Sequence, residues 1–191
     1  MHLRKIGLCA TLLSIGLVRA DEETLLRSGE IRSSGFGGPM VKFSPVNGEF
    51  GVLVGGRGGW LINSVFSIGG GGYGLANSVR ADNPDSVQIN LGIGGVVMEA
   101  VFLPNKLVHG TASLLIGAGS VQKHMDHRDN MDPESFFALE PEINLEINVL
   151  KFFRICPGVS YRWLAGDLEW VDSGWDISGP SANLTFKFGK F

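Results

Sequence analysis

The sequence contains very little cysteine. Its 191 residues include two, Cys9 and Cys156. Cys9 lies near the start of an apolar run at the N-terminus, which we expect to be removed on export for the reason given next. The mature chain then keeps Cys156 alone, and one cysteine cannot form an internal disulfide framework. Covalent cross-linking is therefore excluded as the source of this protein's stability.

The N-terminal apolar run is short. It extends from Ile6 to Val18, whereas a membrane-spanning helix needs about 20 apolar residues. It follows the basic start Met-His-Leu-Arg-Lys and ends in Val-Arg-Ala, the small-residue pattern of a signal-peptide cleavage site. We predict cleavage after Ala20, although a retained amphipathic anchor is an alternative. The expected organisation is a signal peptide at 1–20, an N-terminal lead-in at 21–33 and a single domain at 34–191.

The mature chain also has no excess of basic charge. Cleavage removes Arg4, Lys5 and Arg19 and no acid, which leaves 16 − 3 = 13 basic residues against 19 acidic ones. The net charge of the mature chain is then 13 − 19 = −6. An acidic chain is repelled by phosphate backbones, so nucleic acid is not an expected partner.

A convincing helical pattern is missing beyond the lead-in, and the dominant period of the sequence is two. Between Leu139 and Val149 apolar residues alternate with acids and asparagines, and a second alternating run extends from Phe153 to Trp163. This alternation is typical of strands with one apolar face. Because the two runs are so close in sequence, we expect them to pair as an antiparallel hairpin.

Eight strands follow from this period. We predict them at roughly 34–45, 48–58, 61–75, 86–103, 106–119, 135–149, 151–165 and 181–191. Tight connections near 59–61, 104–105 and 150–151 largely alternate with long polar ones at 76–85, 120–134 and 166–180; the first hairpin, at 45–48, is also short. The pattern predicts an all-β, eight-stranded antiparallel up-and-down β-barrel. Strand lengths that match the ~9–11 residues of a tilted span predict that this barrel is transmembrane.

The fourth predicted strand contains a change of phase. Val87, Ile89, Leu91 and Ile93 define one face, and the apolar residues from Val96 to Phe102 continue it one position out of phase. A β-bulge at Gly94-Gly95 would restore a single apolar face. We therefore expect a bulge at this point.

Alternation alone does not say whether the apolar face meets lipid or a soluble core. The apolar faces are nearly free of charge, the polar faces are rich in glycine and serine, and four aromatic residues fall near predicted strand ends: Trp60, Tyr161, Trp163 and Phe191. Aromatic girdles of this kind lie at membrane interfaces. These features favour lipid on the outside. The alternative is a soluble periplasmic barrel whose apolar face points inward and binds an apolar ligand.

The ending SGPSANLTFKFGKF, with Phe191 as its last residue, resembles the terminal strand of bacterial outer-membrane β-barrels. The layout over residues 34–191 resembles the small eight-stranded members of that class, and the glycine-rich stretch resembles a poorly characterised group of exported proteins. The resemblance implies the bacterial outer membrane as the location, the lipid bilayer as a partner and a monomer without cofactor. One departure is that Phe191 shares a face with Lys187 rather than with Phe186 and Phe188.

The polar faces carry charges that a barrel of eight strands must enclose, because its interior is only wide enough to be filled by side chains. Enclosed charges must pair or lose their charge. We predict a structural salt-bridged plug, with a narrow ion or small-solute channel as the alternative. The predicted lumen cluster is Lys42, Arg57, Glu99, Glu140, Glu142, Glu146, Arg154 and Arg162.

Two polar connections carry residue types that bind ligands. His124, Asp126, His127 and Asp129 could ligate a transition metal, but a solvated loop is the better interpretation, because nothing preorganises the ligands. The connection 166–180 combines four acids with Trp170 and Trp175, which could contact a sugar or a cationic partner. We expect structural or recognition roles for the long connections, and we expect no metal site in them.

Catalysis and nucleotide binding are both disfavoured. His109 lies near Thr111 and Ser113 at the predicted tight-turn rim, but no positioned triad can be identified, so we expect no enzyme. Gly69, Gly71 and Gly74 satisfy G-x-G-x-x-G, yet no amphipathic helix follows to carry a phosphate site. We interpret the glycines as strand positions that permit close approach and curvature in a small barrel.

Overall fold

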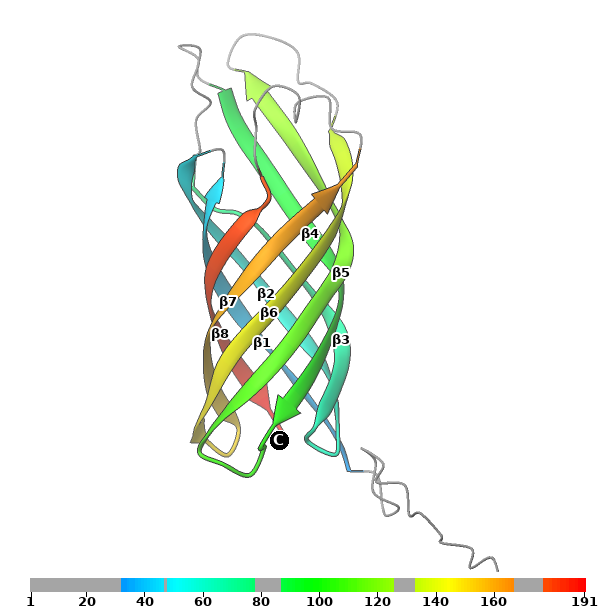
Figure 1. The fold of residues 1–191 in the computed structure, drawn as a ribbon, viewed down its shortest axis with the longest axis vertical. Helices are drawn as coiled ribbons and strands as arrows, with labels where there is room; N and C mark the ends of the chain where they lie inside the picture. Colours follow the sequence, from blue (N-terminus) through cyan, green and yellow to red (C-terminus); the bar gives the residue numbers. More distant parts are fainter. Residues whose placement is uncertain (1–31, 47, 78–86, 126–132, 167–176) are drawn as a thin grey trace, which may run out of the picture.

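The computed structural model describes residues 32–46, 48–77, 87–125, 133–166 and 177–191. They form a closed barrel in which each strand pairs with the next and β8 pairs with β1 (Figure 1). Every pairing is antiparallel, as the sequence predicted. The strands are β1 (Ser33–Val46), β2 (Glu49–Ile62), β3 (Phe66–Leu75), β4 (Val87–Phe102), β5 (Val108–Met125), β6 (Glu134–Leu150), β7 (Phe153–Ala165) and β8 (Gly179–Gly189).

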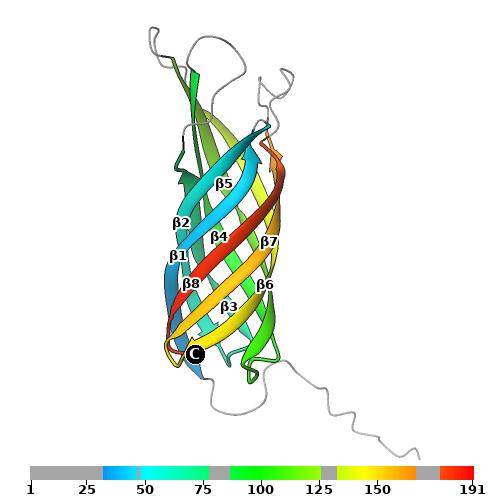
Figure 2. The ribbon, with the colours of Figure 1, turned by 90° about the vertical axis from the view of Figure 1, so that its left-hand side faces the viewer.

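The two ends of the barrel differ. The turns at 63–65, 103–107 and 151–152 lie together at one end, with the C-terminus beside them (Figures 1 and 2). We call this end the turn rim. The opposite end, the loop rim, contains the β1–β2 hairpin and the strand ends that flank 78–86, 126–132 and 167–176. Among the residues that the structure describes, no helix is long and apolar enough to cross a membrane.

Two of the predicted connections were misplaced. The β2–β3 connection lies at 63–65 rather than at 59–61, because Asn63 (φ 51°) and Ser64 (φ 60°) adopt the left-handed conformation that a tight hairpin turn requires. The Asn63 side chain also accepts a hydrogen bond from the backbone of Arg32 at 2.9 Å. Strand β5 continues to Met125 instead of ending at 119, since its pairing with β4 runs on to Val87. The connection predicted at 120–134 is correspondingly shorter.

The predicted bulge in β4 is absent. Gly94 and Gly95 pair with Ala118 and Gly117 in an unbroken register. Leu91 therefore faces the lumen with 4% of its surface exposed, while Val96 faces outward with 49% exposed. The apolar pattern changes phase because the barrel interior is itself apolar near the loop rim, so the strand keeps its register and changes the face that carries apolar side chains.

The outer surface of the barrel is a belt of large apolar side chains. Toward the turn rim the belt contains Trp60, and toward the loop rim it contains Trp163; both are about half exposed, at 53% and 52%. Other exposed members are Phe43, Val54, Phe66, Ile68, Val96, Phe102, Phe137, Ile143, Leu145, Val159, Tyr161 and Phe188. The soluble alternative requires these faces to point inward, and they point outward.

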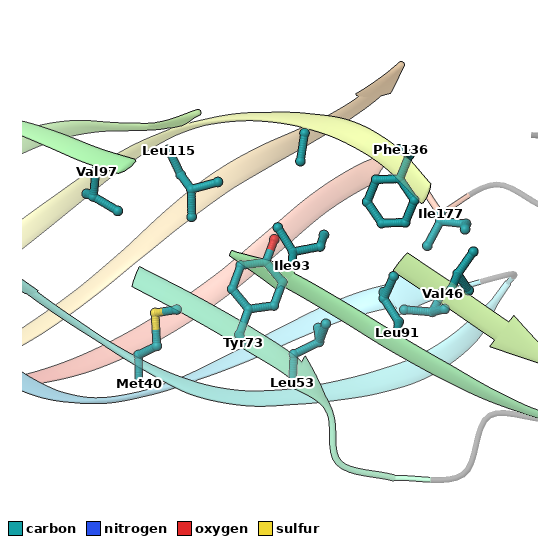
Figure 3. Close-up of a cluster of buried hydrophobic side chains, with 12 residues drawn as sticks. Met40, Val46, Leu53, Tyr73, Leu91, Ile93, Val97, Leu115, Phe136 and Ile177 are labelled. Carbon is teal, nitrogen blue, oxygen red and sulfur yellow. The ribbon is translucent and has the colours of Figure 1, made fainter. Parts of the chain in front are cut away.

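The lumen is filled in two layers. Near the loop rim lies an apolar layer that consists of Val46, Leu53, Leu91, Ile93, Val121, Phe136, Ala138 and Ile177 (Figure 3). Below it, toward the turn rim, buried charged and polar side chains predominate, and Met40, Val97 and Leu115 of the same apolar cluster lie among them. Tyr73 joins the two layers, because its ring packs in the apolar cluster and its hydroxyl donates a hydrogen bond to Glu140.

Glycines allow the strands to approach one another closely on the inner face. A Cβ added to Gly117 would lie 2.1 Å from the carbonyl oxygen of Gly94, so no other residue fits there without moving the backbone. Gly69, Gly71 and Gly74, which match the nucleotide fingerprint, all lie within β3 and pair with β2. No helix begins at Gly74, and the nucleotide interpretation therefore fails in favour of close strand packing.

Candidate functional site

The charged lumen is the most distinctive chemical feature of the barrel. All eight residues predicted for it face inward from β1, β2, β4, β6 and β7, and the most exposed of them, Arg57 and Arg154, reach only 8%. The alternation of each strand is sufficient to place them inside, since successive side chains point to opposite faces. The structure shows in addition which of these side chains are in contact with one another.

The upper part of the charged layer is centred on Lys42. Its ammonium donates hydrogen bonds to Glu140 at 2.7 Å and to Glu142 at 2.9 Å. Arg57 donates to the other oxygen of Glu142 at 2.6 Å. Ser160 donates to Glu140 at 2.5 Å, so both carboxylates are held by several donors at once.

The lower part is centred on Lys187, which the sequence analysis did not include. Its ammonium donates to Glu99 at 2.6 Å and to Glu146 at 2.7 Å. Arg154 donates to Glu146 at 2.6 Å. Arg57 lies 3.7 Å from Glu99 and thus joins the lower part to the upper one. Lys187 and Thr185 share the inner face of β8 and alternate with apolar residues on the outer face. That alternation was the signal that could have identified Lys187.

The two parts form one balanced network. Four cations, Lys42, Arg57, Arg154 and Lys187, contact four carboxylates, Glu99, Glu140, Glu142 and Glu146. Each of these side chains is at least nine-tenths buried. A charge removed from water is tolerated when an opposite charge and hydrogen bonds compensate it. The one-to-one balance supplies that compensation.

Arg162 differs from the other predicted members. It is fully buried, yet its guanidinium donates to the carbonyl oxygen of Ile177 at 2.9 Å and to the hydroxyl of Ser44 at 3.2 Å. It lies at the apolar end of the lumen, where Ile177 belongs to the apolar layer. Arg162, on β7, therefore ties the segment that leads into β8 to β1.

The histidine and hydroxyl groups in the lumen do not form a hydrolase site. His109 contacts the carbonyl oxygen of Lys106 through Nδ1 at 3.2 Å, and its Nε2 lies 3.6 Å from Glu146. Ser160 lies 3.4 Å from the ammonium of Lys42, but that ammonium is occupied by two carboxylates. A nucleophile needs a free base and access to substrate, and Ser160 is buried at 7% exposure.

Two aromatic rings lie over the ionic layer at the turn-rim end of the lumen. The Phe191 ring lies beyond the end of β8, which stops at Gly189 instead of reaching 191. The guanidinium of Arg154 stacks on it, with the guanidinium carbon 3.7 Å from the ring centroid. Phe36 lies beside it, with ring centroids 6.3 Å apart, and the Lys187 ammonium is 4.8 Å from the Phe36 ring. Phe191 thus covers the ionic layer rather than extending the apolar belt.

Little free space remains inside. A cavity of about 10 Å³ lies beside the upper part of the ionic network, where Lys42, Arg57 and Glu142 face apolar side chains such as Met40 and Leu115. That volume holds about one water molecule. An ion path needs a hydrated lumen along its whole length, and the packed layers on both sides of this cavity oppose one.

The predicted metal ligands fall mostly outside the described part of the chain. His124 is the second-last residue of β5, at the loop rim. Asp126, His127 and Asp129 are outside the described residues. Among the residues that the structure describes, no group of three or more metal-binding side chains comes together. The tryptophans of the connection 166–180 also lie outside the described residues.

The fold is similar to that of small outer-membrane barrels of known structure. Neisserial surface protein A matches with a TM-score of 0.60 and 10% identity, over 85% of this chain and 100% of that chain. The N-terminal β-barrel domain of Pseudomonas aeruginosa OprF matches with a TM-score of 0.59 and 10% identity, over 84% and 99%. These matches confirm the resemblance to eight-stranded outer-membrane barrels at the level of the fold.

A third match concerns a barrel solved with a ligand. Ail, the attachment invasion locus protein of Yersinia pestis, in complex with the heparin analogue sucrose octasulfate, has a TM-score of 0.52 and 16% identity, over 85% of this chain and 100% of that chain. No protein-family model and no curated protein matches the sequence. The chain is therefore an eight-stranded antiparallel barrel of the kind found in outer-membrane proteins.

Proposed function

We propose that this chain is a non-enzymatic protein of the bacterial outer membrane, exported by the signal peptide at 1–20 and inserted as a monomeric barrel with a sealed lumen. One observation carries the proposal: the distribution of side chains is the reverse of that in a water-soluble protein. Its charges are enclosed and paired, while large apolar side chains such as Trp60, Ile143 and Val159 are 53%, 67% and 62% exposed. A bilayer is the solvent that such a surface fits.

Fractionation and gel migration test the location. We expect the mature chain to appear in the outer-membrane fraction and to migrate faster on gels without boiling than after it, because a closed barrel resists detergent until it is heated. Substituting Ile143 and Val159 by lysine places charge on the belt, which costs about 2–4 kcal/mol for each lysine at the bilayer midplane. The conservative changes Ile143→Val and Val159→Ile keep the belt apolar and provide the matched control. A mature chain that stays soluble without detergent would refute the proposal.

The channel alternative makes a separate prediction. Because the paired charges and the ring of Phe191 occupy the lumen, we expect no conductance in planar bilayers from the wild type or from Arg154→Ala. Removing the Arg154 side chain breaks its contacts with Glu146 and Phe191, while the network above it stays packed. Unitary conductance steps in the wild type would establish the channel and overturn the sealed lumen.

The connections at 76–86, 126–133 and 166–178, which the strand bounds leave between β3 and β4, β5 and β6, and β7 and β8, are proposed as the recognition surface. The segments 78–86, 126–132 and 167–176 carry nine acids against Arg80 and Arg128. Ail was solved with a sulfated polyanion, whereas these acidic connections favour a cationic partner. Replacing Asp167, Glu169, Asp172 and Asp176 by their amides should weaken binding of cells to a polylysine surface, with Arg128→Gln as a control that raises it. Equal binding by cells with the wild type, the four-amide variant and Arg128→Gln would refute this part of the proposal.

A further inference from the structure

The exposed charges of the described residues are segregated between the two rims. Exposed cations occur at the turn rim: Arg32, Lys106, Lys151 and Lys190. The described acids lie either in the lumen or, for Glu49 and Glu134, at the loop rim. Within the described part of the chain, the turn rim therefore presents a net positive charge from its side chains, with no acidic side chain beside them.

Hydrogen bonds hold these cations on one continuous arc. The backbone nitrogen of Asn148 donates to Leu107 at 3.0 Å, and its side-chain amide donates to Lys106 at 2.9 Å, which ties the 103–107 turn to the 151–152 turn. Gly189 donates to Phe152 at 3.0 Å, and Lys190 donates to Gly35 at 3.1 Å. The arc thus runs through neighbouring strands from Lys106 past Lys151 to Lys190.

The same turns expose apolar side chains at their tips. Leu103 and Leu107 are 70% and 69% exposed, and Leu150 and Phe152 are 53% and 57% exposed. Leu103 also adopts a φ of 57°, a conformation that turns usually assign to glycine or asparagine. A polar residue would suit both this backbone and an aqueous rim. The leucine at this position indicates that the turn tip meets an apolar environment.

We propose that the turn rim binds anionic phospholipid headgroups of the membrane leaflet it faces. The apolar turn tips enter the boundary between the headgroups and the acyl chains. The alkyl part of each lysine lies along this apolar region, and its ammonium extends to the phosphates. Each cation near an anionic surface contributes about 1 kcal/mol at moderate salt, which corresponds to about fivefold in affinity. The inference rests on the membrane insertion proposed above and adds a lipid class and an orientation to it.

Two exposed tryptophans make the inference testable at each rim. Trp60 pairs with Gly35 on the neighbouring strand, close to the backbone position of Lys190, whereas Trp163 lies near the loop rim. Single-tryptophan versions of the mature chain, with the other tryptophans changed to phenylalanine, are reconstituted into phosphatidylcholine vesicles. A minor fraction of the lipid is brominated phosphatidylglycerol or brominated phosphatidylcholine, and each quenches a tryptophan that it touches.

We expect brominated phosphatidylglycerol to quench Trp60 more than brominated phosphatidylcholine does, and to show no such preference at Trp163, because the acids lie at the loop rim. The variant K106Q/K151Q/K190Q should lose the preference at Trp60, the matched variant K106R/K151R/K190R should keep it, and high salt should weaken it. Equal quenching of Trp60 by the two lipids in the wild type overturns the inference. No quenching of either tryptophan by either lipid would instead refute membrane insertion itself.

The chain offers a rival occupant for the arc. Residues 21–31 contain four acids, Asp21, Glu22, Glu23 and Glu30, and directly precede Arg32. If this segment covers the lysines, the wild type shows no lipid preference and a version without residues 21–31 acquires one. That result overturns the inference, whereas an equal preference in both versions supports it.

Discussion

The apolar and ionic layers fill the same lumen by different physical means. In the apolar layer, residues such as Leu53 and Phe136 need only fit by volume, and their burial is favourable by itself. In the ionic layer, burial costs free energy unless every charge finds its partner. The difference shows that a small barrel can be filled in either way, but that the ionic half tolerates change only when both members of a pair change together.

The largest effect is expected from breaking a pair in the ionic layer. Lys42→Met keeps the length of the side chain but leaves Glu140 without its ammonium partner. A buried pair that loses one partner typically costs about 3–5 kcal/mol of unfolding free energy. Urea unfolding in detergent micelles or vesicles measures the loss.

The matched control for this change is the double variant Lys42→Met/Glu140→Gln, which removes the stranded charge as well. We expect it to recover part of the loss, because the amide oxygen can accept a hydrogen bond from one of the hydroxyls of Tyr73 and Ser160 while the amide nitrogen donates to the other. A single variant as stable as the wild type would show that the ion pairs contribute nothing to the fold.

A comparable loss is expected in the apolar layer, without any rescue by charge. Phe136 is 3% exposed and packs against Gly119, so Phe136→Ala leaves a cavity that costs about 3–4 kcal/mol. The adjacent Phe137 is 48% exposed on the outer belt, and Phe137→Ala should cost less in the same unfolding experiment. Equal losses at the two positions would contradict the assignment of the inner and outer faces.

The glycines provide a smaller and sharper test of the same two faces. Gly117→Ala forces a Cβ against the carbonyl of Gly94 and should cost about 1–3 kcal/mol through the resulting backbone shift. Gly94→Ala points outward, where the nearest atom is 3.7 Å away, and should change stability by less than about 0.5 kcal/mol. The temperature at which each variant loses its fast migration on gels gives the ranking. A reversed order would contradict the inner and outer faces assigned to β4 and β5.

The smallest effect is expected at the turn rim. Phe191→Ala removes the ring that stacks on Arg154, a contact worth about 0.5–1 kcal/mol. Phe191→Tyr keeps an aromatic face and should restore wild-type stability in urea. If alanine and tyrosine destabilise the barrel equally, the ring does not act through the arginine.

Much of this architecture could be predicted from sequence because its causes are local. Alternation between Leu139 and Val149 shows which side chains share a face, and that assignment survived in β6. Pattern reasoning failed where a face changes its environment along one strand. Leu91 and Val96 lie on opposite faces, and only the unbroken register with β5 shows that no bulge is needed between them.

The contacts within the lumen could not be predicted, because they join residues far apart in the chain. Lys187 and Glu99 are 88 positions apart and meet only because β8 closes the barrel against β1. The sequence pattern predicted that Arg162 belongs with the ion pairs. Its position near the loop-rim end of β7 instead places it beside Ile177, at the apolar end of the lumen. No local pattern encodes the height of a side chain in a tilted strand.

By itself the sequence determined the strands, their faces and the enclosure of charge, since period-two alternation and turn chemistry act over a few residues. The tertiary structure decided which charges pair, where the apolar layer replaces them, and that Phe191 covers the lumen instead of extending the belt. These outcomes depend on closure, which fixes the stagger of the strands and thereby brings distant side chains to the same level of one narrow interior.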